Sequence, residues 1–261
     1  MSGDQGTLNT WFDGPVGWLE IHNPTRRNAL DLQMLEAFPG ALKSLMDGGA
    51  RSVVLTGSGT KAFSSGYDLA ALRTGAGEDW VEDSGHPLTQ ALDVLQALDA
   101  PLLLAANGPV IGGGVLLLLA ADIALASGNA WLSIPAARVG VVYPLAGLED
   151  LFSTLGRGRA MDLLLTARRL PATEAERWGL YQRLTGEGEL RKATQALAAE
   201  IAALAPLSHA GHRAFAVGRN HGRRAQIESH LAHARQAHAS ADHVEGLNAM
   251  KERRKPRFCG S

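Results

Sequence analysis

The chain has 261 residues, of which 46% are hydrophobic and 20% are charged, as is ordinary for a globular protein in water. Its net charge of −1 and its pI of about 6.8 exclude the strongly cationic field that general nucleic-acid or membrane-surface binders need. The single cysteine, Cys259, excludes a disulfide framework and a cysteine-rich metal site within one chain.

The first half of the chain predicts strands that alternate with helices. Leu8–Phe12 and Val16–His22 favour two strands around an Asp-Gly-Pro turn, and a helix from about Asp31 to Leu45 follows, with Asp31 as its cap. Hydrophobic spacing then predicts strand, helix, strand, helix and two strands, at Arg51–Thr56, Pro87–Leu98, Pro101–Ala106, Gly113–Leu119, Asp122–Ala126 and Ala130–Ile134. The polar stretch Leu69–Gly85 is predicted to be a mobile flap.

The second half favours helices almost throughout. They are expected at Leu148–Leu155, Arg159–Leu165, Thr173–Gly179, Glu187–Ala205, Ser208–Val217 and Arg223–His238. Strand–helix alternation followed by a run of helices predicts an α/β core, which we place at residues 1–200, with a C-terminal helical region at 201–261.

The chain gives no signal for membrane insertion or export. Met1–Thr10 is polar and lacks the apolar core of a signal peptide, and the apolar run Val115–Ala121 is too short to cross a bilayer. We therefore expect a cytoplasmic protein that binds neither membranes nor nucleic acid.

Two ligand classes are weighed and set aside. Pairs of histidines spaced three apart share helix faces, but without a His-Glu-x-x-His pattern they favour solvated side chains, so no metal is expected; they lie at 209 and 212 and at 230 and 233. Gly57-x-Gly59-x-x-Ala62 matches a dinucleotide fingerprint, which requires a helix to begin at once. The following Phe63–Gly66 is typical of a loop, which argues against a nicotinamide enzyme.

Two glycine-rich stretches carry the chemistry. Ala62–Asp68 reads A-F-S-S-G-Y-D and Asn107–Gly114 reads N-G-P-V-I-G-G-G, and each follows a predicted buried strand. Such turns bring bare backbone close to a ligand, and two N–H groups that converge on one carbonyl oxygen form an oxyanion hole.

This pairing of motifs resembles the crotonase (enoyl-CoA hydratase/isomerase) superfamily, and the likeness extends over nearly the whole chain, including Leu163–Leu180. The resemblance implies the α/β crotonase (ClpP-like) fold, with repeated ββα units and a helical C-terminal trimerisation region. It also implies an acyl-CoA thioester as substrate, with no cofactor beyond coenzyme A and no metal. A homotrimer, or a hexamer built as a dimer of trimers, is expected, and the C-terminal region would also close the coenzyme A site.

The resemblance assigns roles to individual residues. Tyr67 donates the first oxyanion N–H, and Gly113 donates the second while opening a buried helix whose dipole adds to the field. Arg26 lies near the nucleotide phosphates. Further contacts to coenzyme A are expected from Ala29, Ser64, Ser65 and Gly66 and from the basic tail through Lys255 and Phe258, a tail that is sometimes contributed by a neighbouring subunit.

Two departures from the family pattern bear on the reaction. Leu116 stands where hydratases keep their first glutamate, and Ala136, after Pro135, stands where they keep the second. Neither side chain can activate water or deliver a proton, so ordinary hydration and proton-shuttling isomerisation through these positions are not expected. A displaced acid, Glu149 or Asp150, is the alternative.

A narrower resemblance concerns Gly140–Gly147 and the ending Gly246–Phe258, which are similar to segments of bacterial methylmalonyl-CoA decarboxylases. Those enzymes keep an acid at the position of Leu116 and a histidine at that of Tyr67. The likeness implies loss of CO₂ from a short malonyl-type thioester, which leaves an enolate that an oxyanion hole stabilises. Leu116, Ala136 and Leu145 would line the acyl pocket, and Tyr143 would orient the carboxylate or protonate the enolate carbon.

Two other functions stay open. An enoyl-CoA hydratase or isomerase with a relocated acid would lose activity on substitution of Glu149 or Asp150. A non-catalytic acyl-CoA-binding protein would show affinity without turnover.

Overall fold

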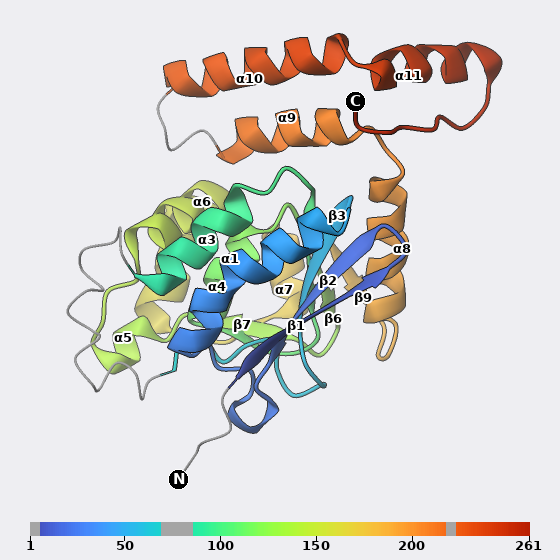
Figure 1. Cartoon of the computed structure of the whole chain (residues 1–261). Helices are drawn as coiled ribbons and strands as arrows, with labels where there is room; N and C mark the ends of the chain where they lie inside the picture. Colours follow the sequence, from blue (N-terminus) through green and yellow to red (C-terminus); the bar gives the residue numbers. More distant parts are fainter. Residues whose placement is uncertain (1–5, 69–85, 218–222) are drawn as a thin grey trace.

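The computed structural model describes residues 6–68, 86–217 and 223–261 (Figure 1). The predicted flap Leu69–Gly85 lies outside the described residues. The expected α/β architecture is confirmed in the described part, where helices cover both faces of a mixed sheet.

The main sheet has six strands in the order β1-β2-β3-β4-β6-β9. These are β1 (Thr7–Asp13), β2 (Val16–His22), β3 (Ser52–Gly57), β4 (Leu102–Ala106), β6 (Ile123–Ser127) and β9 (Arg183–Thr185). β1 runs antiparallel to β2, and the other neighbours are parallel. All six residues of β3 are buried, which is typical of a parallel strand covered on both faces.

Side chains of β3 alternate between two hydrophobic clusters. Val53 and Leu55 belong to the larger cluster, with α1 (Leu32–Asp47), α3 (Pro87–Gln96) and α4 (Gly113–Ala120). Val54 points to the smaller cluster, which α8 (Leu190–Ala202) covers. The two-residue period of a strand thus distributes one apolar run over two cores.

A second, three-stranded sheet consists of β5 (Val110–Ile111), β7 (Trp131–Ser133) and β8 (Leu170–Pro171). β5 follows β4 and leads into α4, and β7 follows β6 and leads into α5 (Ala136–Val139). Each unit therefore runs strand, strand, helix. The turn between β4 and β5 positions the second glycine-rich stretch at the beginning of α4.

The predicted elements need one addition. α6 (Leu145–Thr166) contains the two helices expected at Leu148–Leu155 and Arg159–Leu165, which meet at a kink where Gly156 has non-helical backbone. α11 (Ala241–Glu252) was not predicted, because its exposed Val244, Leu247 and Met250 give it no continuous buried face. The helix expected at Thr173–Gly179 is α7 (Ala172–Arg177). The elements too short for a pattern to indicate are η1 (Pro24–Arg26), α5, β5, β8 and β9.

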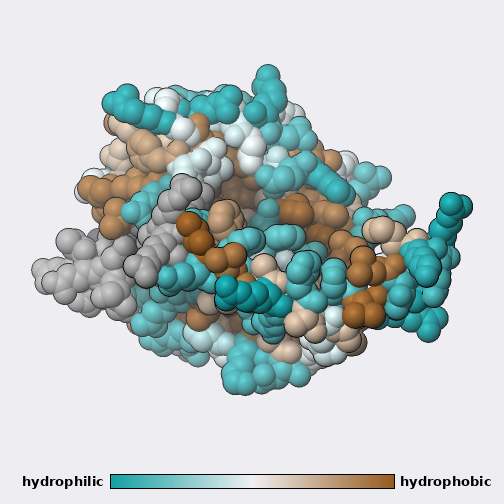
Figure 2. Space-filling view, turned by 90° about the horizontal axis from the view of Figure 1, so that it is seen from above, coloured by the Kyte–Doolittle hydropathy of each residue, from teal (hydrophilic) through white to brown (hydrophobic). Residues whose placement is uncertain are grey.

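Three C-terminal helices form a layer of their own beside the core (Figure 1). They are α9 (Pro206–Val217), α10 (Arg223–His238) and α11. Neither hydrophobic cluster found in the described ranges includes a residue of these helices. Seen from above (Figure 2), apolar side chains lie among hydrophilic ones across this layer. Among the described helices, none is long and apolar enough to span a membrane.

Candidate active site

A buried asparagine holds together the loops that lead to the first glycine-rich stretch. Asn28 adopts a left-handed conformation, with φ of 57°, and is 1% exposed. Its side-chain amide donates to the carbonyls of Ser58 and Ala62 at 3.0 and 2.8 Å, and its Oδ1 accepts from Ser58 Oγ at 2.9 Å. Its own carbonyl accepts from Ser64 Oγ at 2.8 Å. Asn28 was not predicted as a site residue. The one signal for it in the sequence was its place in Asn28-Ala29-Leu30, beside the predicted contact Ala29.

The backbone around Tyr67 is paired on both sides. Leu30 N–H donates to the Gly66 carbonyl at 2.9 Å, and Asp68 N–H donates to the Leu30 carbonyl at 3.0 Å. These bonds form a short parallel bridge between Leu30 and Tyr67. On the other side, Ile111 N–H donates to the Ser64 carbonyl at 3.0 Å. The two glycine-rich stretches are therefore locked to each other and to the N-terminal loop.

The structure brings the two predicted oxyanion donors close together. Gly66 has a φ of 89°, and a methyl group there would lie 2.7 Å from the Ile111 carbonyl oxygen and 3.0 Å from Gly113 N. A methyl group on Gly113 would lie 3.3 Å from Tyr67 N. Bare backbone is thus required on both sides, and Gly113 N–H, as the first of α4, has no partner carbonyl within its own helix.

The peptide that precedes Gly113 is fixed from several directions. Gly112 has a φ of 53°, and its N–H donates to the Ser133 carbonyl at 3.0 Å. Its carbonyl accepts from the Tyr143 hydroxyl at 2.9 Å. Tyr143 is 7% exposed, and burial raises its pKa, which keeps the phenol neutral. The hydroxyl thus contacts the glycine turn, and its predicted contact with substrate stays a prediction.

Two aromatic residues border the first donor. Tyr67 is buried, and its ring lies 5.3 Å from that of His86. Burial raises the pKa of Tyr67, and the negative charge of Asp68 raises it further. His86 is buried as well and caps α3, where its Nδ1 accepts from Leu88 N–H at 3.1 Å. His86 was not predicted as a site residue. Its position beside Tyr67 follows from its role as the cap of α3, which the sequence did not indicate.

Of the predicted acyl-pocket residues, only Leu116 is deeply buried. It is 2% exposed, and its Cδ2 would lie 2.0 Å from a methyl group on Gly147. Tyr143 lies on the same side of Gly147, with its Cε1 3.0 Å from that methyl position. Ala136 is partly buried, whereas the Leu145 side chain is 62% exposed. Leu116 and Ala136 therefore present apolar side chains and no carboxylate here.

The predicted coenzyme A contacts fall into two groups. Arg26, Ala29 and Ser65 lie together, since Ser65 Oγ donates to the Arg26 carbonyl at 2.9 Å and the Arg26 guanidinium pairs with Asp68. The chain end does not join them. The Phe258 carbonyl accepts from Arg51 at 2.8 Å, and Lys255 lies in the segment between there and α11.

In Figure 1 the segment that follows α11 runs beside the end of α9, within the C-terminal helical layer. The predicted contacts of Lys255 and Phe258 with coenzyme A stay a prediction.

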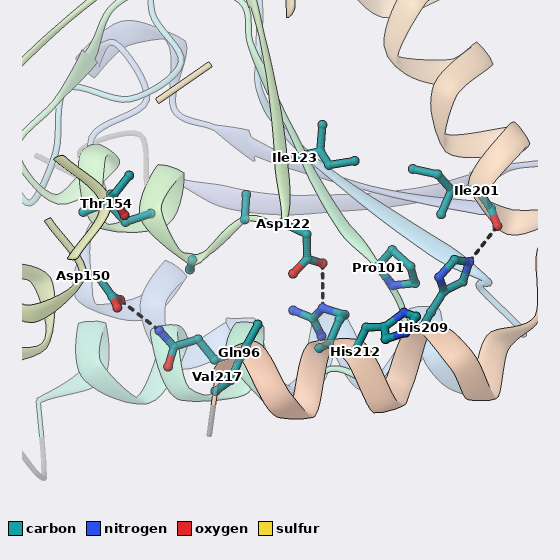
Figure 3. Close-up of a pocket in the computed structure, with 15 residues that line it drawn as sticks. Gln96, Pro101, Asp122, Ile123, Asp150, Thr154, Ile201, His209, His212 and Val217 are labelled. Carbon is teal, nitrogen blue, oxygen red and sulfur yellow. Dashed lines mark hydrogen bonds and ion pairs between the residues drawn. The ribbon is translucent and has the colours of Figure 1, made fainter. Parts of the chain in front are cut away.

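Glu149 and Asp150, the two alternative acids, both lie on α6. Asp150 lines a separate cavity of about 510 Å³, shown in Figure 3, where it accepts from Gln96 Nε2 at 3.2 Å. That cavity is bordered by Leu119–Ile123, at the end of α4 opposite to Gly113. Eight helical residues separate the two ends by roughly 10 Å. Glu149 is exposed.

The cavity in Figure 3 also contains the ion pair between Asp122 Oδ2 and Arg213 Nε, at 2.6 Å. Arg213 is buried and also donates to the carbonyls of Leu95 and Leu98, so it fastens α9 to the core. Within the described ranges, no group of three or more His, Cys, Asp or Glu side chains is arranged to hold a metal ion.

Comparison with known proteins agrees with this geometry. A family model described as enoyl-CoA hydratase/isomerase matches residues 12–261. The chain is 36% identical over 246 residues to the Mycobacterium bovis protein described as "Probable enoyl-CoA hydratase echA6", covering 93% of this chain and 95% of that protein. It is 32% identical over 260 residues to the carnitinyl-CoA dehydratase of Salmonella typhi, covering 97% and 98%.

Solved structures give the same result for the fold. An enoyl-CoA hydratase from Bacillus anthracis superposes with a TM-score of 0.89 at 27% identity, covering 98% of this chain and 100% of that one. An enoyl-CoA hydratase/carnithine racemase from Magnetospirillum magneticum gives a TM-score of 0.89 at 28% identity, covering 99% and 97%. The expected crotonase fold is thereby confirmed.

Proposed function

Because the chain belongs to the enoyl-CoA hydratase/isomerase family, we propose that it binds an acyl-CoA thioester and stabilises the enolate between Tyr67 N–H and Gly113 N–H. The observation that carries the proposal is the close approach of Gly66 to Gly113 N, beside an apolar Leu116. A preorganised pair of amide donors contributes about 3–4 kcal/mol of transition-state stabilisation for each donor.

The reaction we prefer is decarboxylation of a short malonyl-type acyl-CoA. The bond between the α-carbon and the carboxylate breaks, CO₂ leaves, and the electron pair moves into the thioester as an enolate. In this proposal a proton from water then completes the α-carbon, and Tyr143 keeps its hydrogen bond to the Gly112 carbonyl. No general base is needed for this step, and an apolar wall at Leu116 and Ala136 favours release of neutral CO₂ over retention of a charged carboxylate.

The coenzyme A part of the substrate would lie along Arg26, Ala29 and Ser64–Gly66. Arg26 would exchange its partner Asp68 for a phosphate, since a guanidinium binds carboxylate and phosphate by the same charge-assisted hydrogen bonds. A hydratase or isomerase reaction is the second candidate, supported by the names of the relatives. It requires an acid that approaches the acyl group, and Asp150 lies at the opposite end of α4.

Incubation with methylmalonyl-CoA and, separately, with crotonyl-CoA tests the proposal, with products identified by mass spectrometry. We expect propionyl-CoA from the first and no hydration of the second. Gly66→Ala should lower the rate by about 10²–10³-fold, because the added methyl group displaces Gly113 N.

Gly14→Ala is the matched control, since Gly14 also has a positive φ, of 60°, but no atom within 4 Å of the added methyl group. It should leave the rate unchanged. Hydration of crotonyl-CoA without decarboxylation would favour the second candidate, and tight binding of both thioesters without any product would identify a non-catalytic acyl-CoA-binding protein.

A further inference from the structure

We infer that Tyr143 is a positioning residue, which strengthens the Gly113 oxyanion donor through the peptide group between Gly112 and Gly113. The inference rests on the proposed function, because it concerns one of the two amides assigned there to the enolate. It assigns the tyrosine a role that requires no contact with substrate.

The peptide group between Gly112 and Gly113 connects the tyrosine to the oxyanion donor. The Tyr143 hydroxyl donates to the Gly112 carbonyl oxygen at 2.9 Å. This oxygen and Gly113 N–H belong to a single planar peptide unit, so fixing the direction of one fixes the direction of the other. A donor at the oxygen also polarises the amide and makes its N–H a stronger donor, an effect estimated at about 10–30% for each hydrogen bond.

Neighbouring hydrogen bonds hold the Gly112–Gly113 peptide together with the tyrosine. Gly112 N–H donates to the Ser133 carbonyl at 3.0 Å, which fixes the turn to β7. Val115 N–H donates to the same Gly112 oxygen at 2.9 Å, which fixes the turn to α4. A carbonyl oxygen accepts two hydrogen bonds, so the tyrosine fills its second position.

The chemistry of the phenol suits this task. Tyr143 is nine-tenths buried, and its burial opposes ionisation, so the hydroxyl remains a donor throughout the neutral range. A phenol has one O–H donor, and here that donor forms its hydrogen bond with the Gly112 carbonyl. The residue therefore delivers its effect as polarisation and orientation, with no proton transferred.

Tyr143→Phe tests the inference because it removes only the hydroxyl. We expect kcat to fall about 5- to 30-fold, the factor that one lost hydrogen bond produces, while KM changes less than about twofold. The pH profile of the remaining activity between pH 6 and 9 should match that of the unsubstituted protein. Tyr181→Phe is the matched control, since Tyr181 is a buried tyrosine of the core, 1% exposed.

An infrared difference measurement supplies a readout that does not depend on turnover. Propionyl-CoA carrying ¹³C at the thioester carbonyl is bound to each protein, and the shift of the C=O stretch from its value in solution is recorded. The unsubstituted protein and Tyr181→Phe should give the same shift to lower frequency, and Tyr143→Phe a smaller one.

The outcomes separate the two proposals. No shift in the unsubstituted protein would mean that bound thioester does not meet the amides, which overturns the proposed function. A normal shift that is unchanged in Tyr143→Phe would overturn the inference alone. A normal shift with a total loss of turnover in Tyr143→Phe would also overturn it, and would make the tyrosine a direct acid.

Discussion

At the scale of single residues, Leu116 and Gly147 form a contact that decides what fills the space beside Gly113. Leu116 is buried on α4, and α6 passes so close that a methyl group on Gly147 would meet its Cδ2 at 2.0 Å. An aliphatic side chain, packed against a glycine of α6, therefore fills this space. The apolar character of the site is therefore maintained by two helices together.

Gly147→Ala measures this contact. Alanine in place of glycine in a helix is ordinarily stabilising by about 0.5–1 kcal/mol, but here the methyl group must displace Leu116. We expect the free energy of unfolding to fall by about 1–3 kcal/mol in urea denaturation.

Gly158→Ala is the control, because Gly158 lies on the same helix with open space around it and should follow the ordinary trend. In a Leu116→Ala background the penalty of Gly147→Ala should disappear. A penalty that persists there would mean that the crowding involves Tyr143 rather than Leu116.

Single residues also show what the sequence could and could not predict about the site. Tyr67 and Gly113 were expected as neighbours from the family resemblance, and in the structure a methyl group on Gly113 would lie 3.3 Å from Tyr67 N. Their roles as oxyanion donors stay a prediction. Asn28 and His86 were not predicted to shape the site. Their roles depend on partners 30 or more residues away or on a helix cap, and no local pattern carries that information.

At the scale of elements, predictions succeeded where burial imposes a period. β3 and β4 are buried throughout, and α1 begins after Asp31, whose side chain accepts from Met34 N–H at 2.8 Å as expected for a cap. The two helices predicted within α6 are present as well and meet at a kink, where Gly156 has a φ of 70°. α11 escaped because its stabilising contacts are made with the chain end rather than with the core.

Asp242 makes those contacts and is the element-scale test of them. It is 2% exposed, and its carboxylate accepts from the N–H groups of Cys259 and Gly260 at 2.7 and 2.9 Å. Asp242→Ala leaves both N–H groups without their acceptor. We therefore expect the free energy of local opening at Cys259 and Gly260 to fall by about 1–3 kcal/mol. Amide hydrogen exchange at residues 259 and 260 should accelerate correspondingly.

Asp242→Asn is the graded control, since it retains one carbonyl acceptor and should accelerate exchange at only one of the two amides. Unchanged exchange in Asp242→Ala would show that the Asp242 carboxylate does not hold residues 259 and 260 in place. Other contacts, such as that of Arg51 with the Phe258 carbonyl, would then hold them.

At the scale of the whole molecule, α10 and α11 present apolar residues that the described chain leaves uncovered. Val244 is 57% exposed, Leu247 56% and Met250 78%, and Ile227 and Leu231 on α10 are exposed too. Figure 2 shows such residues spread over this layer among hydrophilic neighbours. Leaving several large apolar side chains in water is unfavourable, and faces of this kind mark sites of association.

The same layer carries the chain end with Lys255 and Phe258. We propose that a second copy covers the apolar face and that the chain end contacts the coenzyme A of that copy. The trimer or hexamer expected from the sequence would provide such a copy. Oligomer formation and coenzyme A affinity should then depend on each other.

Met250→Glu tests this dependence by placing a charge on the exposed face of α11. We expect sedimentation equilibrium to show dissociation toward monomers, together with a loss of affinity for propionyl-CoA. Asn248→Glu adds the same charge at another exposed position of α11 and should change neither property if the apolar face is specific. Lys255→Ala should weaken binding while leaving the oligomer intact. Dissociation with full affinity would mean that each chain binds coenzyme A by itself, and the tail would then have no part in the site.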